Sequence, residues 1–154
     1  AVGFRLQWKF LSASINRGAQ RNSRQIEQDR RKIEVKKTAV IGASENPMRY
    51  SNMAVRLLDE YDHEVVALGR RDGHINDMDV IKQWPEKIEN LDTLTLYLNP
   101  KNQEEHYDYI IGLHPKRIIF NPGTENIELA QRAHAEGIET TEACTLVLLR
   151  TNQY

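Results

Sequence analysis

Short apolar runs alternate with amphipathic segments along the chain from residue 35 onward. Most of these runs are rich in Val, Ile and Leu and stop at turn-forming residues, which is typical of strands buried on both faces of a sheet. The pattern predicts strands over residues 35–41, 64–68, 91–98, 116–120 and 138–141. It also predicts a short strand at Val80-Ile81, after a polar loop over residues 72–79.

Between these strands, apolar residues recur at the three- and four-residue spacing of one helical face. The first such segment begins near Ser51, a residue type that caps helix N-termini. A second helix is predicted from residue 102 to 113, and a third after Thr124 that ends before Gly137. The apolar segment 144–150 closes the domain.

Regular alternation of strands and helices predicts an α/β fold with a parallel sheet. Right-handed crossovers then give a Rossmann-like, doubly wound, mostly parallel sheet with helices on both faces. In such sheets the carboxyl ends of the strands lie along one edge, and ligands bind where the strand order reverses. Five turn clusters are therefore expected around one crevice: Gly42-Ala43-Ser44, Gly69-Arg70, Asn99-Pro100, Asn121-Pro122-Gly123 and Glu142-Ala143-Cys144. The alternative is that they are ordinary connecting turns.

The chain has 154 residues, one of them Cys, and a formal net charge of −1. This length suits one domain with a tail. A single Cys excludes a disulfide framework and a Cys-based zinc site and is typical of a reducing compartment, so we expect a cytoplasmic protein. No apolar run approaches the roughly 18 residues of a membrane span. The near-neutral charge gives no reason to expect nucleic acid as a partner.

The N-terminal segment differs from the rest in charge. Residues 1–35 contain 8 Lys and Arg against 3 Asp and Glu, whereas residues 36–154 contain 13 against 19. Three interpretations of the basic segment stay open: a non-native or dispensable extension, an ordered accessory helix, and an organelle transit peptide. We therefore expect a division into an extension, 1–35, and one folded domain, 36–154.

Charge near the helix starts favours the first loop as a phosphate site. Free N–H groups and the macrodipole make a helix N-terminus attractive to anions. The later helices begin with acidic pairs that repel a phosphate, Glu104 with Glu105 and Glu125 with Glu128. The first helix is entered through a loop that contains Gly42, Ala43, Ser44, Asn46, Pro47, Arg49 and Ser51. This loop lacks the full G-x-G-x-x-G pattern, since Ser44 and Pro47 stand where the later glycines would be.

The end of the second predicted strand reads Gly69-Arg70-Arg71. An enzyme that uses NAD places an acidic residue there to bind the ribose hydroxyls. Two arginines instead suit an additional phosphate on the ribose, through charge-assisted bidentate hydrogen bonds. The 3′-phosphate of coenzyme A and the 2′-phosphate of NADP both fit. The alternative is a solvated pair of surface arginines, one of them paired with Asp72.

An ordered set of segments from Lys37 to Tyr154 resembles the small stand-alone CoA-binding proteins, which are similar to the N-terminal CoA-binding domain of the succinyl-CoA synthetase α subunit. The segments are Val40-Ile41-Gly42-Ala43-Ser44 with Asn46-Pro47 and Ser51, then Thr95-Leu96-Tyr97-Leu98-Asn99-Pro100, Phe120-Asn121-Pro122-Gly123-Thr124-Glu125 and Glu142-Ala143-Cys144-Thr145-Leu146. They run in order through this stretch, which is about three quarters of the chain, and residues 1–35 lie outside it.

The resemblance implies a Rossmann-like fold with coenzyme A as ligand. By this resemblance the loop with Gly42, Ala43, Ser44 and Arg49 would hold the diphosphate, and Arg70 or Arg71 would meet the 3′-phosphate end. Asn99-Pro100 would line the adenine or pantetheine path, and Asn121-Pro122-Gly123 would bound the far side of the crevice. The synthetase has a more glycine-rich first loop. Its ligase activity also needs a phosphorylated His and a nucleotide-grasp module, so we do not expect that activity to be inherited.

No catalytic group or metal site is predicted. The five histidines, at positions 63, 74, 106, 114 and 134, occupy polar positions and are expected at the surface. Cys144 is either a thiol that meets the ligand thiol or a small buried residue, and Glu142 is either a base or a capping carboxylate. We expect non-catalytic binding of coenzyme A or an acyl-CoA, with no prediction of a protein partner. The alternatives are an NADP-binding small oxidoreductase and an interaction subunit with a vestigial nucleotide crevice.

Overall fold

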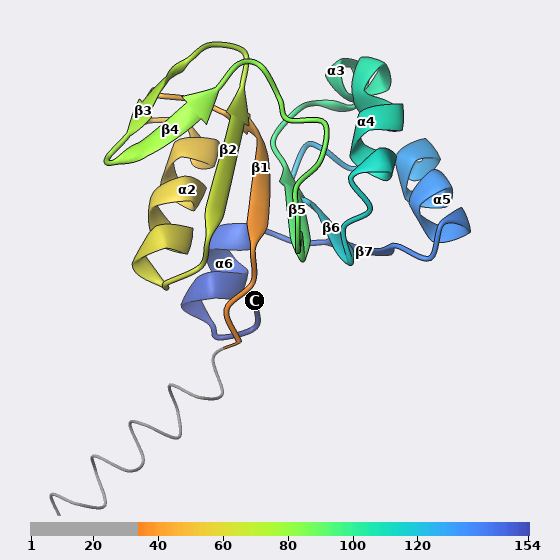
Figure 1. Ribbon diagram of the computed structural model, residues 1–154. Coiled ribbons are helices and arrows are strands. Elements are labelled where there is room, and N and C mark those ends of the chain that lie inside the picture. Colours follow the sequence, from red (N-terminus) through yellow and green to blue (C-terminus); the bar gives the residue numbers. More distant parts are fainter. Residues whose placement is uncertain (1–33) are drawn as a thin grey trace, which may run out of the picture. The chain divides into compact units, whose positions relative to one another are not determined.

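The computed structural model describes residues 34–154, which contain a seven-stranded sheet flanked by helices (Figure 1). The strands are β1 (Thr38–Ala43), β2 (Val65–Gly69), β3 (Gly73–Ile75), β4 (Met78–Ile81), β5 (Thr93–Leu96), β6 (Arg117–Phe120) and β7 (Glu139–Glu142). The helices are α2 (Tyr50–Glu60), α3 (Pro100–Gln103), a 3-10 turn η1 (Glu104–His106), α4 (Tyr107–Gly112), α5 (Ile127–Ala135) and α6 (Thr145–Arg150).

The strand order is β3-β4-β2-β1-β5-β6-β7. All pairings are parallel except that of β3 with β4. In β1, Thr38 lies opposite Val65 of β2 on one side and opposite Thr93 of β5 on the other. The chain therefore runs outward from β1 in one direction, returns to β5 and continues in the other direction. This confirms the predicted doubly wound, mostly parallel sheet, with its reversal between β1 and β5.

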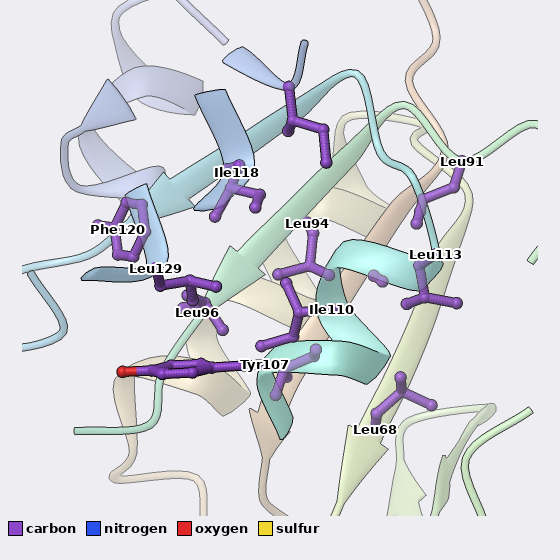
Figure 2. Packing of buried hydrophobic residues seen from close by; sticks show 14 residues of the cluster. Leu68, Leu91, Leu94, Leu96, Tyr107, Ile110, Leu113, Ile118, Phe120 and Leu129 are labelled. Atoms are coloured by element: carbon purple, nitrogen blue, oxygen red, sulfur yellow. The ribbon is translucent and has the colours of Figure 1, made fainter. Parts of the chain in front are cut away.

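Alternating residues of β1 enter two separate cores. Ile41 belongs to a cluster with Ile110 of α4 and Leu129 of α5, whereas Val40 packs in a second cluster with Leu58 of α2. Figure 2 shows the first cluster, in which Tyr107 and Ile110 lie near Leu94 and Leu96 of the sheet. Figure 1 shows α4 and α5 apart from α2 and α6. Helices therefore cover both faces, as the buried strand pattern predicts.

Several predicted boundaries are wrong. The segment 72–79, predicted as a loop, contains β3 and the start of β4, which form a hairpin around Asn76 at φ +53°. The strand predicted over 91–98 is only Thr93–Leu96. Ser51 is not an N-cap, because α2 begins at Tyr50 after Arg49. The helix predicted from 102 begins at Pro100, since the side chain of Asn99 caps it.

His63 was expected at the surface and is buried, with 7% of its surface exposed. Its Nδ1 atom accepts a hydrogen bond from the backbone N–H of Lys36 at 3.0 Å, and its ring packs on that of Tyr154 at 4.9 Å. Burial, followed by the charge of Lys36, lowers the pKa of His63. The imidazole is thus a neutral core residue at the edge of the sheet opposite the strand carboxyl ends.

Candidate functional site

A cavity of about 270 Å³ lies at the carboxyl edge of the sheet, where the strand order reverses. It takes residues from the ends of β1, β2, β4 and β5, from the segment after β4, and from α3 and η1. The lining residues are Gly42, Gly69, Arg70, Lys82, Trp84, Leu98, Asn102, Glu105 and His106. Clefts for small molecules usually measure roughly 300–1,000 Å³, so this one suits part of a nucleotide-sized ligand.

Two glycines let the backbones approach closely beside this cavity. A Cβ atom on Gly42, at φ +95°, would lie 3.1 Å from the carbonyl carbon and oxygen of Tyr97. A Cβ atom on Gly69 would lie 2.5 Å from the carbonyl oxygen of Ala43. Larger residues would therefore push apart the strand ends that form the cavity floor.

Trp84 forms an aromatic wall of the cavity. Its indole Nε1–H donates to the carbonyl oxygen of Gly69 at 3.0 Å. The indole ring packs on His106 at 4.4 Å and on Tyr109 at 5.4 Å between ring centres. The hydroxyl of Tyr109 donates to the carbonyl oxygen of Pro85 at 2.7 Å, which fixes the segment that carries Trp84. These contacts hold the indole in one orientation.

Side chains of both charge signs line the cavity. Arg70 follows β2 and Lys82 follows β4, whereas Glu105 lies on η1 with its carboxylate 3.3 Å from the Nε2 atom of His106. Asp72 accepts the backbone N–H of Lys82 at 2.9 Å, and no ion pair joins it to Arg70 or Arg71 within residues 34–154. An anion would thus be attracted to the β2–β4 end.

The loop from Gly42 to Arg49 is held by its own polar groups. The Oγ atom of Ser44 accepts from the backbone N–H of Asn46 at 3.1 Å, and the amide of Asn52 donates to the carbonyl oxygen of Ser44 at 2.9 Å. Glu45 accepts the backbone N–H of His74 at 2.7 Å, which ties the loop to β3. The loop is therefore anchored on both sides.

The N-terminus of α2 has no side-chain cap and no acidic residue in its first turn. In contrast, Asn99 accepts from the backbone N–H of Asn102 at the start of α3, and Asn126 does the same for Leu129 in α5. No capping side chain therefore accepts a hydrogen bond from the first backbone N–H groups of α2. In α3 and α5, a capping Asn accepts from one of these groups.

In two of the predicted loops the asparagine side chain is hydrogen-bonded within the protein. Asn121, 2% exposed, donates to the Oγ1 atom of Thr95 at 2.6 Å and to the carbonyl oxygen of Leu96 at 2.8 Å. Its Oδ1 atom accepts the backbone N–H of Thr145 at 2.9 Å. The side chain of Asn99 is used as the α3 cap. Pro100, Pro122 and Gly123 are exposed.

The structure brings together Gly42, Gly69 and Arg70 as cavity lining. The remaining predicted residues lie outside this lining: Ala43, Ser44, Asn46, Pro47, Arg49 and Ser51 in or after the first loop, Arg71 after β2, and Asn99, Pro100, Asn121, Pro122 and Gly123 after β5 and β6. Sequence analysis missed Lys82, Trp84, Leu98, Asn102, Glu105 and His106 as cavity residues. A Trp in an otherwise polar stretch after the short strand was the one available signal for them.

Chemically reactive groups are sparse among residues 34–154. In this part of the chain, no group of three or more His, Cys, Asp or Glu side chains is arranged to hold a metal ion. Cys144 is half-buried at the N-cap of α6, and Glu142 is exposed at the end of β7. Burial raises the pKa of Tyr97, so its phenol stays protonated. None of the helices described is long and apolar enough to cross a membrane.

Comparison with known proteins gives one family and several structural relatives. The sequence profile of the CoA binding domain family matches residues 36–150. The chain is similar to a solved structure of an uncharacterized protein, with 43% identity, a TM-score of 0.76, and coverage of 79% of this chain and 99% of that one. No curated protein matches the chain.

Two more distant structures share the fold. A hypothetical protein from Pyrococcus horikoshii OT3 is 22% identical, with a TM-score of 0.66 and coverage of 80% of this chain and 89% of that one. A protein from Thermus thermophilus is 18% identical, with a TM-score of 0.69 and coverage of 85% and 98%. These similarities support the Rossmann-like architecture described above.

Proposed function

The chain belongs to the family of CoA binding domains, and from this premise we propose that it binds coenzyme A or an acyl-CoA in the cavity at the carboxyl edge of the sheet, without transforming it. The observation that carries the proposal is the position and charge of the cavity. It lies at the reversal of strand order, and Arg70 and Lys82 line it beside the aromatic wall of Trp84. Coenzyme A presents the matching groups, because it joins a planar base to several phosphates.

The proposal assigns the additional ribose phosphate to the β2–β4 end of the cavity. Arg70 lines the cavity there, and the exposed Arg71 is its neighbour in the chain. A guanidinium binds a phosphate through two parallel hydrogen bonds, which an ammonium cannot do. Lys82 supplies a second positive charge at this end.

The diphosphate is assigned to the first loop, which continues from Gly42 at the cavity through Ala43 and Ser44 to Arg49. Support comes from the N-terminus of α2, which has neither a capping side chain nor an acidic residue in its first turn. Asn46, Pro47 and Ser51 would then shape the loop, with Ser51 buried beneath it. Asn99-Pro100 and Asn121-Pro122-Gly123 would lie along and beyond the pantetheine path.

A non-catalytic role is proposed because the titratable pair in the cavity is engaged by the protein itself. His106 packs on Trp84 and its Nε2 atom lies beside Glu105, so this imidazole is already held by protein groups on its face and at one nitrogen. A general base needs a free lone pair directed at its substrate.

Thermal melting with four cofactors tests the proposal. A ligand at about 100 times its Kd stabilises the fold by about 2.7 kcal/mol, which is a visible shift in Tm. We expect a clear shift with coenzyme A, a smaller one with dephospho-CoA, and little with NAD or NADPH. A larger shift with NADPH would favour the oxidoreductase alternative, and no shift with any of the four would favour an interaction subunit.

A further inference from the structure

Exposed apolar side chains gather on one helical layer of the molecule. In the part of the chain that the structure describes, five large apolar side chains are more than half exposed. Met48 and Tyr50 lie at the start of α2, and Val147 lies on α6, which packs beside α2 on the same face of the sheet (Figure 1). Apolar residues that gather in one place at a surface often mark an interaction site, whereas single ones do not.

Further apolar residues continue from Tyr50 along one side of α2. Met53, Leu57 and Tyr61 follow it at steps of three and four residues, which places all four on one side of the helix. Tyr50 is 70% exposed and the other three side chains are half-buried. None of the four is among the residues that α2 buries. These four residues, here called the α2 stripe, therefore present an apolar surface that the protein's own core does not fully cover.

The two ends of α2 carry opposite charges. Arg49 lies at the N-cap, whereas Asp59 and Glu60 lie in the last turn, and all three are exposed. The guanidinium of Arg56, between them, donates from Nε to the Oδ1 atom of Asn52 at 2.8 Å. Within the described part of the chain, no ion pair involves Arg49 or Glu60. Both end charges are therefore available to an external partner.

A second copy of the chain complements this pattern when its α2 runs antiparallel to the first. Arg49 and Glu60 are about 16 Å apart along the helix axis, at about 1.5 Å per residue. A two-fold axis at the middle of the helix then brings Arg49 of each copy opposite Glu60 of the other, with one α2 stripe against the other between them. A parallel arrangement would set like charges against each other. The surface is thus complementary to itself, which a symmetric dimer requires.

We propose that two copies of this chain form a symmetric dimer through their α2 helices. The two α2 stripes form its apolar centre, and two pairs of Arg49 with Glu60 form its charged rim, which is the usual arrangement of a protein interface. The partner is therefore a second copy of this chain. Dimer formation in this arrangement needs no ligand, so the inference is independent of the proposed binding of coenzyme A.

Sedimentation velocity of the full chain without ligand measures the dimer Kd. Between about 1 and about 100 µM we expect a change from monomer to dimer. Tyr50→Glu places a charge in the apolar centre and should raise the Kd by about tenfold or more. An acidic residue in the first turn suits the helix dipole, so the variant should fold, which its melting at low concentration checks. Ile127→Glu is the matched control, because Ile127 is also an exposed apolar residue at the first position of a helix, and its Kd should stay unchanged.

A charge exchange tests the antiparallel arrangement without changing the apolar centre. Arg49→Glu and Glu60→Arg each set like charges against each other at both rim pairs, so each should raise the Kd by about three- to tenfold. The combined variant restores opposite charges and should return the Kd to within about twofold of that of the unchanged protein. A chain that stays monomeric at about 100 µM, a dimer that Tyr50→Glu does not weaken, or a combined variant no tighter than the single ones would each overturn the inference.

Discussion

The indole of Trp84 donates a hydrogen bond to the carbonyl oxygen of Gly69, with the two atoms 3.0 Å apart. This bond joins the segment after β4 to the end of β2, although 15 positions separate the two residues in the chain. The wall and the floor of the cavity are thus one connected unit. A change at Trp84 should affect both the shape of the cavity and the affinity for a ligand.

The first prediction separates the ring of Trp84 from its hydrogen bond. Trp84→Phe keeps an aromatic wall and loses the bond to Gly69, so we expect about 1 kcal/mol lower stability and a CoA affinity within about threefold. If the adenine base stacks on this ring as proposed, Trp84→Ala should weaken binding by about tenfold or more. Calorimetry measures both variants. Equal affinities of Trp84→Ala and the unchanged protein would mean that the base lies elsewhere.

The second prediction compares two neighbouring arginines. Arg70 lines the cavity and Arg71 does not. A charge-assisted hydrogen bond contributes about 1.5–3 kcal/mol, so Arg70→Gln should weaken CoA binding by about ten- to a hundredfold, and Arg71→Gln should change it much less. Dephospho-CoA lacks the phosphate assigned to Arg70, so its affinity should barely respond to Arg70→Gln. A similar loss with both ligands would contradict this assignment.

The third prediction concerns the diphosphate. Ser44→Asp places a carboxylate in the first loop that can still accept the N–H of Asn46, as the Oγ atom of Ser44 does now. Melting should stay nearly unchanged, while CoA binding falls by more than about tenfold through charge repulsion. Ser44→Asn is the matched control, because it has the same shape without the charge and should bind CoA. Retained affinity in Ser44→Asp would mean that the phosphates lie away from this loop.

The sequence pattern predicted the sheet correctly because a buried strand is marked by consecutive apolar residues within the strand itself. Residues 39–41 are apolar and buried on both faces of β1, and both faces of β1 are covered by helices. The strand predicted at Val80-Ile81 is the end of β4, but the hairpin that β4 forms with β3 was missed, since strands of three and four residues are too short to show a clear alternation. The pairing is made across the turn, where the backbones of Gly73 to Ile75 and Met78 to Val80 lie opposite each other and the Nδ1 atom of His74 lies 2.9 Å from a carboxylate oxygen of Asp79, and periodicity does not reveal such contacts.

The sequence does not show which way the side chain after each strand points. Asn99 and Asn121 both follow a strand and precede a proline, yet Asn99 caps a helix and Asn121 is bonded within the core. The direction of a side chain does not matter at Gly42 and Gly69, because these residues allow the backbones to approach closely by having no side chain. Trp84 comes from a connecting segment whose position is set by distant partners, Gly69 and Tyr109, so no spacing rule could place it.

The fourth prediction separates crowding from backbone strain at three glycines. Gly112 is the last residue of α4, its φ lies outside the left-handed region, and no atom lies within 4 Å of where a Cβ would be added. Gly112→Ala should therefore be neutral or stabilising by up to about 1 kcal/mol. Gly123 has φ +89° and open space, so Gly123→Ala should cost about 1–2 kcal/mol. Gly42 has φ +95° and the backbone of Tyr97 at 3.1 Å from an added Cβ, so Gly42→Ala should cost more. Urea unfolding measures the stability of the three variants. Equal losses at Gly42 and Gly123 would show that the backbone of Tyr97 moves away from the added methyl group at no cost in free energy.

The last prediction concerns pH and His63. Burial lowers the pKa of this imidazole below its ordinary value of 6.5, and the nearby Lys36 lowers it further. The unfolded chain therefore binds a proton at His63 before the folded protein does. Stability from the neutral ring is fully present above pH 6.5 and is lost as the pH falls from there through the lower, folded pKa.

Unfolding free energy should thus decrease as the pH is lowered from about 7 to about 5.5, with a slope of at most about 1.4 kcal/mol per pH unit from this one proton. In His63→Gln the slope should be flatter, even if the variant is less stable at every pH. His114→Asn is the matched control, because His114 is exposed and its φ of +52° suits Asn, and it should keep the steep slope. Urea titrations at several pH values measure all three proteins. Parallel curves for His63→Gln and the unchanged protein would show that the burial of His63 does not control acid stability.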